Sequence, residues 1–138
     1  MDTPEHREAE ARLRRIGVPI TLQRLEIARV LLPRPVHLSA EQVLLKVREA
    51  APETSRATVY NTLRLFREKG LIKELIVDPE RVVYDSNTAP HHHIYDIDSG
   101  ELSDVAAHEL QVIGIPALPA DIELAQVDVI VRVRSRRG

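Results

Sequence analysis

The sequence has 138 residues, 43% of them hydrophobic, with 19 Lys and Arg, 21 Asp and Glu, and no Cys. This length suits one ordinary domain or two small ones. The lack of Cys excludes disulfides, thiolate zinc sites and cysteine nucleophiles. No apolar run is long enough for a membrane-spanning helix, so we expect a cytoplasmic protein without membrane association. Residues 1–84 carry 15 basic and 12 acidic side chains, whereas residues 85–138 carry 4 and 9. We therefore expect the first half to meet polyanions and the second to collect cations.

Four helices separated by Pro and Gly are predicted in the first half. Apolar residues recur at helical spacing, and Ser or Thr stands where a capping side chain is needed. Ser39 and Gln42, for example, form a capping-box pattern at the start of the third helix. The expected ranges are Thr3–Ile16, 22–32, Ala40–Ala50 and Arg56–Lys69. A short loop containing Pro52 joins the last two, which indicates a helix-turn-helix.

Two β-rich segments follow the fourth helix. Leu71–Val77 and Arg81–Asp85 flank an Asp-Pro turn, which is the pattern of a β-hairpin. A helix-turn-helix followed by a hairpin is the arrangement of a winged helix. The first half is therefore predicted to be a winged-helix DNA-binding domain.

The fourth helix has a polar face suited to the major groove of DNA. Arg56, Thr58, Tyr60, Asn61 and Arg64 share this face, and the apolar residues point the other way. Asn and Arg can pair with base edges, while Thr and Tyr can contact phosphates or thymine methyl groups. The alternative is an ordinary amphipathic surface helix. The hairpin that follows favours the DNA-binding interpretation, because the two together match a winged helix.

The second half is expected to consist mostly of strands. The expected elements are strands at His93–Ile97 and Leu102–Val105, a short helix from Ala106 to about Ile113, and a final strand over Glu123–Arg134. The predicted fold class is α+β. Its expected parts are a winged-helix domain over residues 1–84, a hinge over 85–90, and a small α/β dimerisation and effector-binding domain over 91–138.

Three consecutive histidines begin the second half. On a strand, His91 and His93 point to one face and His92 to the other. Two imidazoles on one face form part of a metal site, and Asp85 and Asp104 lie on candidate neighbouring strands. The alternative is a solvated polar histidine run.

These motifs together resemble the ferric uptake regulator (Fur) superfamily over nearly the whole chain. The matching segments are Ile20–Arg24, His37–Glu41, Ala57–Leu63, Gly70–Ile72, His91–His93 and Gly100–Asp104. The resemblance implies an N-terminal winged helix, a C-terminal dimerisation domain, and a homodimer that binds palindromic operator DNA. It also implies one regulatory divalent-metal site, for Fe²⁺, Mn²⁺ or Zn²⁺, at His37, Asp85, His91, His93 and Asp104. With the helix pattern, it gives as DNA-binding residues Arg24, Ser55, Arg56, Thr58, Tyr60, Asn61 and Arg64.

Departures from the family pattern bear on which metal sites and which branch of the family we expect. The structural zinc bound by four Cys is absent, since Asp96 and Ser99 occupy the first Cys pair and the chain has no Cys. The set of departures looks most like the iron response regulator (Irr) branch, which is associated with haem control of iron and haem genes. That similarity suggests haem binding by His91, His92 and His93.

Two other functions compete with a metal- or haem-responsive repressor of iron genes. Asp104, where iron-sensing members more often carry Glu, matches the ligand pattern of peroxide sensors, in which peroxide reacting at bound Fe²⁺ oxidises a coordinating His. A hydrolytic metalloenzyme using the same residues is the remote alternative. The sequence carries no separate catalytic signature, so no enzymatic activity is expected.

Overall fold

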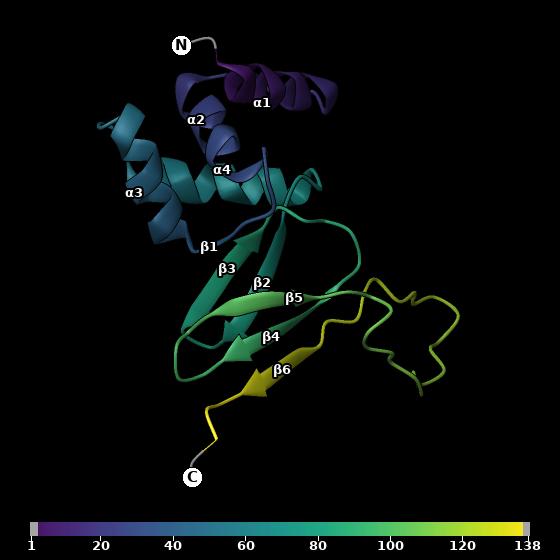
Figure 1. Ribbon diagram of the computed structural model, residues 1–138. Coiled ribbons are helices and arrows are strands. Elements are labelled where there is room, and N and C mark those ends of the chain that lie inside the picture. The colour runs from purple at the N-terminus through teal and green to yellow at the C-terminus, as the bar shows by residue number, and fades with distance from the viewer. Residues whose placement is uncertain (1–2, 137–138) are drawn as a thin grey trace. The chain divides into compact units, whose positions relative to one another are not determined.

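The computed structural model describes residues 3–136. It has the α+β architecture that the sequence predicts, with four helices in the first part of the chain and most of the strands after them (Figure 1). The chain divides into two compact units between Thr88 and Ala89. None of the helices in the described part of the chain is long and apolar enough to cross a membrane.

The four predicted helices form with ends within one or two residues of the expected ones. Their ranges are Pro4–Arg15 (α1), Leu22–Leu31 (α2), Ala40–Ala50 (α3) and Arg56–Glu68 (α4). Each begins after a Ser or Thr whose side-chain oxygen accepts a hydrogen bond from a backbone N–H three residues later. The capping box predicted at Ser39 and Gln42 is complete in both directions.

The core of the first unit lies where the apolar faces of these helices meet. Side chains from all four helices are removed from solvent, and the largest of them is Phe66 of α4. Other fully buried residues of this core include Leu13, Ile27, Leu31, Val43, Leu44, Val47, Val59 and Leu63. Burial of one face of α4 leaves the opposite, polar face at the surface.

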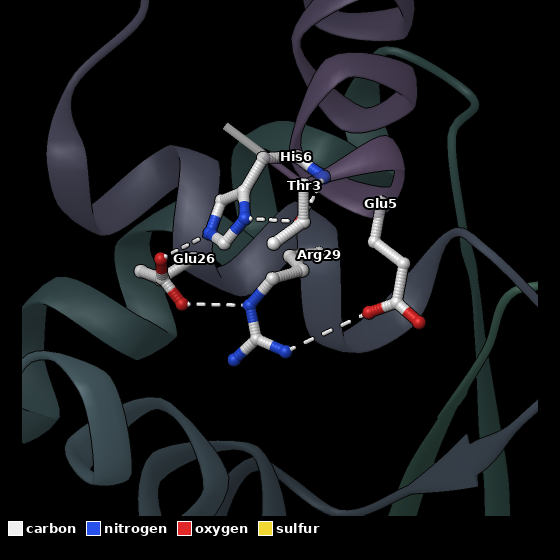
Figure 2. Close-up of polar contacts among 5 residues, drawn as sticks. All are labelled: Thr3, Glu5, His6, Glu26 and Arg29. Carbon is white, nitrogen blue, oxygen red and sulfur yellow. Dashed lines mark hydrogen bonds and ion pairs between the residues drawn. The ribbon is translucent and has the colours of Figure 1, made fainter. Parts of the chain in front are cut away.

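A buried polar network joins the start of α1 to α2 (Figure 2). His6 Nε2 lies 2.7 Å from Oε1 of the fully buried Glu26, and Arg29 Nε donates to Glu26 Oε2 at 2.8 Å. Thr3 Oγ1 lies 2.6 Å from His6 Nδ1, and Glu5 lies 3.9 Å from Arg29 Nη1. Burial alone would raise the pKa of the Glu26 carboxyl, but hydrogen bonds from His6 and Arg29 bring it below its ordinary value.

A small sheet completes the first unit. The predicted hairpin is confirmed as Lys73–Asp78 (β2) and Arg81–Asp85 (β3). A short strand that the sequence did not predict, His37–Leu38 (β1), pairs with the other edge of β3. The sheet order is therefore β1-β3-β2, and the register places His37 opposite Asp85.

The second unit is a three-stranded sheet with a long irregular segment. Its strands are His92–Asp96 (β4), Leu102–Val105 (β5) and Ile130–Val133 (β6). β4 lies in the middle, antiparallel to β5 and parallel to β6. The first two strands agree with the sequence prediction to within a residue.

Two predictions for the second unit are wrong. The helix expected from Ala106 to about Ile113 is replaced by a turn at residues 107–109, with irregular chain after it. So short a helix is marginal without an apolar surface to pack on, and most of this segment is exposed. The strand expected over the whole of Glu123–Arg134 is too long: only Ile130–Val133 forms a strand, since β4 offers only five residues as a partner.

Candidate metal centre and DNA-recognition helix

The first unit brings together two of the predicted metal ligands. His37 on β1 and Asp85 at the end of β3 are register partners, and His37 Nε2 lies 3.2 Å from Asp85 Oδ2. Asp85 is 1% exposed, and its other oxygen accepts a hydrogen bond from the backbone N–H of Asn87 at 2.8 Å. One carboxylate oxygen is thus held by the backbone, while the other is directed at an imidazole.

The second unit brings together the other three. His93 on β4 lies opposite Asp104 on β5, and His91 stands just before β4 on the same side. Asp104 Oδ1 lies 3.3 Å from His91 Nε2 and 3.5 Å from His93 Nε2. The three residues each offer a ligand atom within 4.8 Å of the others. The two histidines that period-two alternation places on one face of the strand are thus the two that lie beside Asp104.

A backbone carbonyl fixes the orientation of the His91 ring. Its Nδ1 lies 2.6 Å from the carbonyl oxygen of Ala89. Because a carbonyl only accepts hydrogen bonds, Nδ1 must carry the proton, and the lone pair of the neutral ring is then on Nε2, toward Asp104. This backbone contact had no signal in the sequence, since any residue at position 89 supplies a carbonyl.

The separations between these atoms suit ligands of a shared ion. A cation about 2.0–2.2 Å from each donor, with tetrahedral or octahedral angles, separates adjacent ligand atoms by about 2.8–3.6 Å. The imidazole–carboxylate separations of 3.2, 3.3 and 3.5 Å lie in this range and exceed the usual 2.9 Å of a hydrogen bond. Imidazole with carboxylate is a donor set that Fe²⁺, Mn²⁺ and Zn²⁺ all accept.

His92 has a different environment from its two neighbours. The backbone N–H of Val129 donates to His92 Nδ1 at 3.2 Å, which ties β4 to the residue just before β6. In the neutral ring the proton is then on Nε2, so neither nitrogen of this tautomer offers a free lone pair. Coordination by His92 would require giving up this hydrogen bond or shifting the proton.

A hydrogen-bonded turn occupies the positions where the family resemblance would put a Cys pair. Asp96 Oδ1 accepts hydrogen bonds from the backbone N–H groups of Asp98 and Ser99, at 2.9 and 3.3 Å. These bonds, from Asp98 first, lower the pKa of the Asp96 carboxyl. Residues 96–99 thus form a turn held by a carboxylate in place of the two thiolates.

The predicted DNA-binding residues divide between two helices. Ser55 caps α4, and its Oγ accepts from Thr58 N–H and donates to Thr58 Oγ1. Tyr60 is 42% exposed, and exposed positions on the same helix are also held by Arg56, Asn61 and Arg64. Arg24 lies apart from them on α2, half-buried, where its guanidinium donates to the Pro19 carbonyl.

One partner of this surface was missed by the sequence analysis. Glu41, on α3, accepts two hydrogen bonds from Arg56. The two residues are 15 positions apart on different helices, so no local periodicity indicated the pair.

Comparisons with known proteins agree over most of the chain. A sequence profile described as the ferric uptake regulator family matches residues 15–131. The peroxide-responsive repressor PerR of Staphylococcus aureus is 36% identical over 109 residues, which span 79% of this chain and 74% of that protein.

Solved structures share the fold. The ferric uptake regulator of Pseudomonas aeruginosa with manganese has a TM-score of 0.68 at 24% identity, covering 94% of this chain and 98% of its own. The peroxide stress regulator of Campylobacter jejuni has a TM-score of 0.59 at 18% identity, covering 95% and 96%. At these identities the likeness shows the fold, a helical N-terminal part followed by a β-sheet domain.

Proposed function

The chain belongs to the ferric uptake regulator family, and from that premise we propose that it is a metal-responsive repressor acting on operator DNA in the cytoplasm. Membership makes it a transcription regulator and not an enzyme. The observation that carries the proposal is the pair of His and Asp groups, one in each unit, with separations that suit metal ligands.

We propose that one divalent ion binds His37, Asp85, His91, His93 and Asp104 together. The first unit alone supplies two of these ligands and the second supplies three, so shared coordination would fill a tetrahedral or larger shell. An ion that requires ligands from both units favours one relative orientation of them. It can change DNA affinity only through that preference.

DNA recognition is assigned to the exposed face of α4. Tyr60, Asn61 and Arg64 would read base edges, and Ser55, Arg56, Thr58 and Arg24 would contact the backbone or flanking bases. Fur-family regulators bind operator DNA as dimers, and two-fold symmetry of the protein requires a two-fold operator.

Dimerisation is assigned to the second unit. Between β5 and β6 it exposes several large apolar side chains that a second copy would cover. They are Ile113, which is 82% exposed, and Ile115, Leu118, Ile122 and Leu124. Sedimentation of the purified protein should show a dimer, and a monomer at micromolar concentration would count against this assignment.

The overall proposal is tested by gel shift on a palindromic operator. The protein is assayed after treatment with a chelator and after loading with Mn²⁺. The two forms are expected to differ in operator affinity, since the ion favours one orientation of the units. Equal affinity in both forms would contradict control by metal. Absence of binding in both forms would contradict recognition of a palindromic operator.

Peroxide sensing is the favoured form of metal control. It is supported by the likeness to a peroxide-responsive repressor. The family resemblance adds Asp104 as a ligand of the type that peroxide sensors use. The five ligands would hold Fe²⁺, which would mediate the electron transfer from the imidazole ring to the peroxide O–O bond without net oxidation of the iron. Oxidation of a ring carbon of His37 or His91 consumes one H₂O₂, adds one oxygen atom to the ring and releases one water.

Mass spectrometry tests this form directly. Protein loaded with Fe²⁺ and treated with peroxide should gain the mass of one oxygen on His37 or His91, and protein loaded with Mn²⁺ should not. A peptide map unchanged after Fe²⁺ and peroxide would contradict peroxide sensing and would favour regulation by the metal alone.

Haem control, as in the Irr branch, is the second candidate. Three adjacent histidines and the absence of Cys support imidazole ligation by His91, His92 or His93. The hydrogen bond from Val129 to His92 opposes it, because that ring nitrogen is already engaged. Titration with haemin decides the matter: a saturable Soret shift lost in the triple Ala variant supports haem binding. A Soret shift that the substitutions leave unchanged would contradict haem ligation by these three histidines.

A further inference from the structure

Arg56, the first residue of α4, is bound to a carboxylate on the neighbouring helix. Its Nε donates to Glu41 Oε1 at 2.6 Å and its Nη2 donates to Oε2 at 3.0 Å. Two parallel hydrogen bonds of this kind are also how an arginine binds phosphate oxygens or the O6 and N7 atoms of guanine. The donor face that Arg56 would offer to DNA is therefore occupied within the protein.

The pair lies where DNA would have to displace it. Arg56 is in the first turn of α4, and N-terminal residues of a recognition helix are those that enter the major groove. The Arg56 and Glu41 side chains are 60% and 51% exposed, so nucleic acid can reach both. Exposed ion pairs are weak, which means that a phosphate can replace the carboxylate at modest cost.

Glu41 remains negative when the exchange takes place. The ordinary carboxyl pKa of 4.5 already lies well below neutral pH, and the hydrogen bonds from Arg56 lower the pKa of Glu41 further while the pair is intact, so Glu41 stays ionised after Arg56 leaves. A phosphate that takes Arg56 therefore leaves a carboxylate unpaired near a polyanion. Both the lost pair and the new repulsion oppose binding that is driven by charge alone.

We propose that Glu41 limits sequence-independent DNA binding by competing with phosphate for Arg56. The proposal rests on the assignment of α4 as the recognition helix and adds to it a residue that determines specificity. Binding to random sequence is almost entirely electrostatic, so an internal competitor for one cation weakens it directly.

Fluorescence anisotropy with a short duplex of mixed sequence tests the proposal. Wild type, Glu41→Gln, Arg56→Gln and the double variant are titrated over a range of salt concentrations, with Mn²⁺ and with chelator. Glu41→Gln should bind about three- to tenfold more tightly, and its plot of log affinity against log salt should steepen by about one. In the Arg56→Gln background the same change should have little effect, because the cation that Glu41 withholds is gone.

Glu49→Gln is the matched control, since Glu49 is also exposed on α3 and its replacement removes the same charge. An equal gain from Glu49→Gln, or from Glu41→Gln with Arg56 already replaced, would show a general charge effect and overturn the proposal. If wild type binds duplex and Glu41→Gln binds no better, the proposal fails alone. If neither the wild type nor any variant binds duplex with or without metal, the assigned DNA-binding function fails as well.

Discussion

Replacing Glu26 with Ala should destabilise the helical unit strongly. Glu26 is fully buried and accepts one hydrogen bond from His6 and one from Arg29. Removing one partner of a buried charged pair costs about 3–5 kcal/mol, because the other charge is left unpaired. Arg29 keeps 23% side-chain exposure and lies 3.9 Å from Glu5, which lessens the loss. We therefore expect a decrease of about 3 kcal/mol in the free energy of unfolding.

Glu26→Gln removes the negative charge while keeping a similar side-chain shape, so it separates the two contributions to stability. The amide has a similar volume, but its NH₂ group must face one of the two donors, so we expect a loss of about 1–3 kcal/mol. Urea unfolding followed by far-ultraviolet circular dichroism measures both variants, because all helices of the described chain lie in this unit. The control is Glu10→Gln, which breaks an exposed pair with Arg14 and should cost less than about 0.5 kcal/mol.

The pH dependence gives an independent check. The pKa of Glu26 is below its ordinary value of 4.5 in the folded protein, so its stabilising effect is complete above pH 4.5. The effect is lost as pH falls through the folded-state pKa. The stability difference between wild type and Glu26→Ala should thus be constant near neutral pH and shrink in acid. A Glu26→Ala variant as stable as Glu10→Gln, or a difference that grows in acid, would refute the reasoning.

Three further outcomes are expected. Arg64→Ala or Tyr60→Ala should weaken operator binding by about 1–3 kcal/mol in anisotropy titrations without dissociating the dimer, and unchanged affinity in both would contradict the role of α4. The double variant His91→Ala, His93→Ala should lose stoichiometric Mn²⁺ binding in calorimetry, whereas His92→Ala should keep it; equal loss from His92→Ala would contradict the strand geometry. Mn²⁺ affinity should fall as the pH is lowered, because protons compete with the ion for its ligands, and an affinity that does not change with pH would contradict a donor set of His and Asp.

Local sequence was sufficient for the helical unit. The ends of α1–α4 followed from capping residues and breakers, since an N-terminal cap acts over only three residues. The hairpin of β2 and β3 followed from two β-rich segments and an Asp-Pro turn. The same local reasoning failed from Ala106 to Ile113, because a short helix depends on a packing surface that local sequence does not reveal.

The sequence by itself determined which residues are chemically able to bind metal and DNA, and alternation along β4 determined that His91 and His93 share a face. Only the tertiary structure decided the partners. β1 is two residues long and has no propensity signal, yet its pairing with β3 sets His37 beside Asp85. The contacts of Glu26 with His6 and of Glu41 with Arg56 likewise join different helices, 20 and 15 residues apart in the chain. Periodicity reports the face on which a side chain lies, whereas its partner depends on how separate elements pack, and this is a property of the folded chain as a whole.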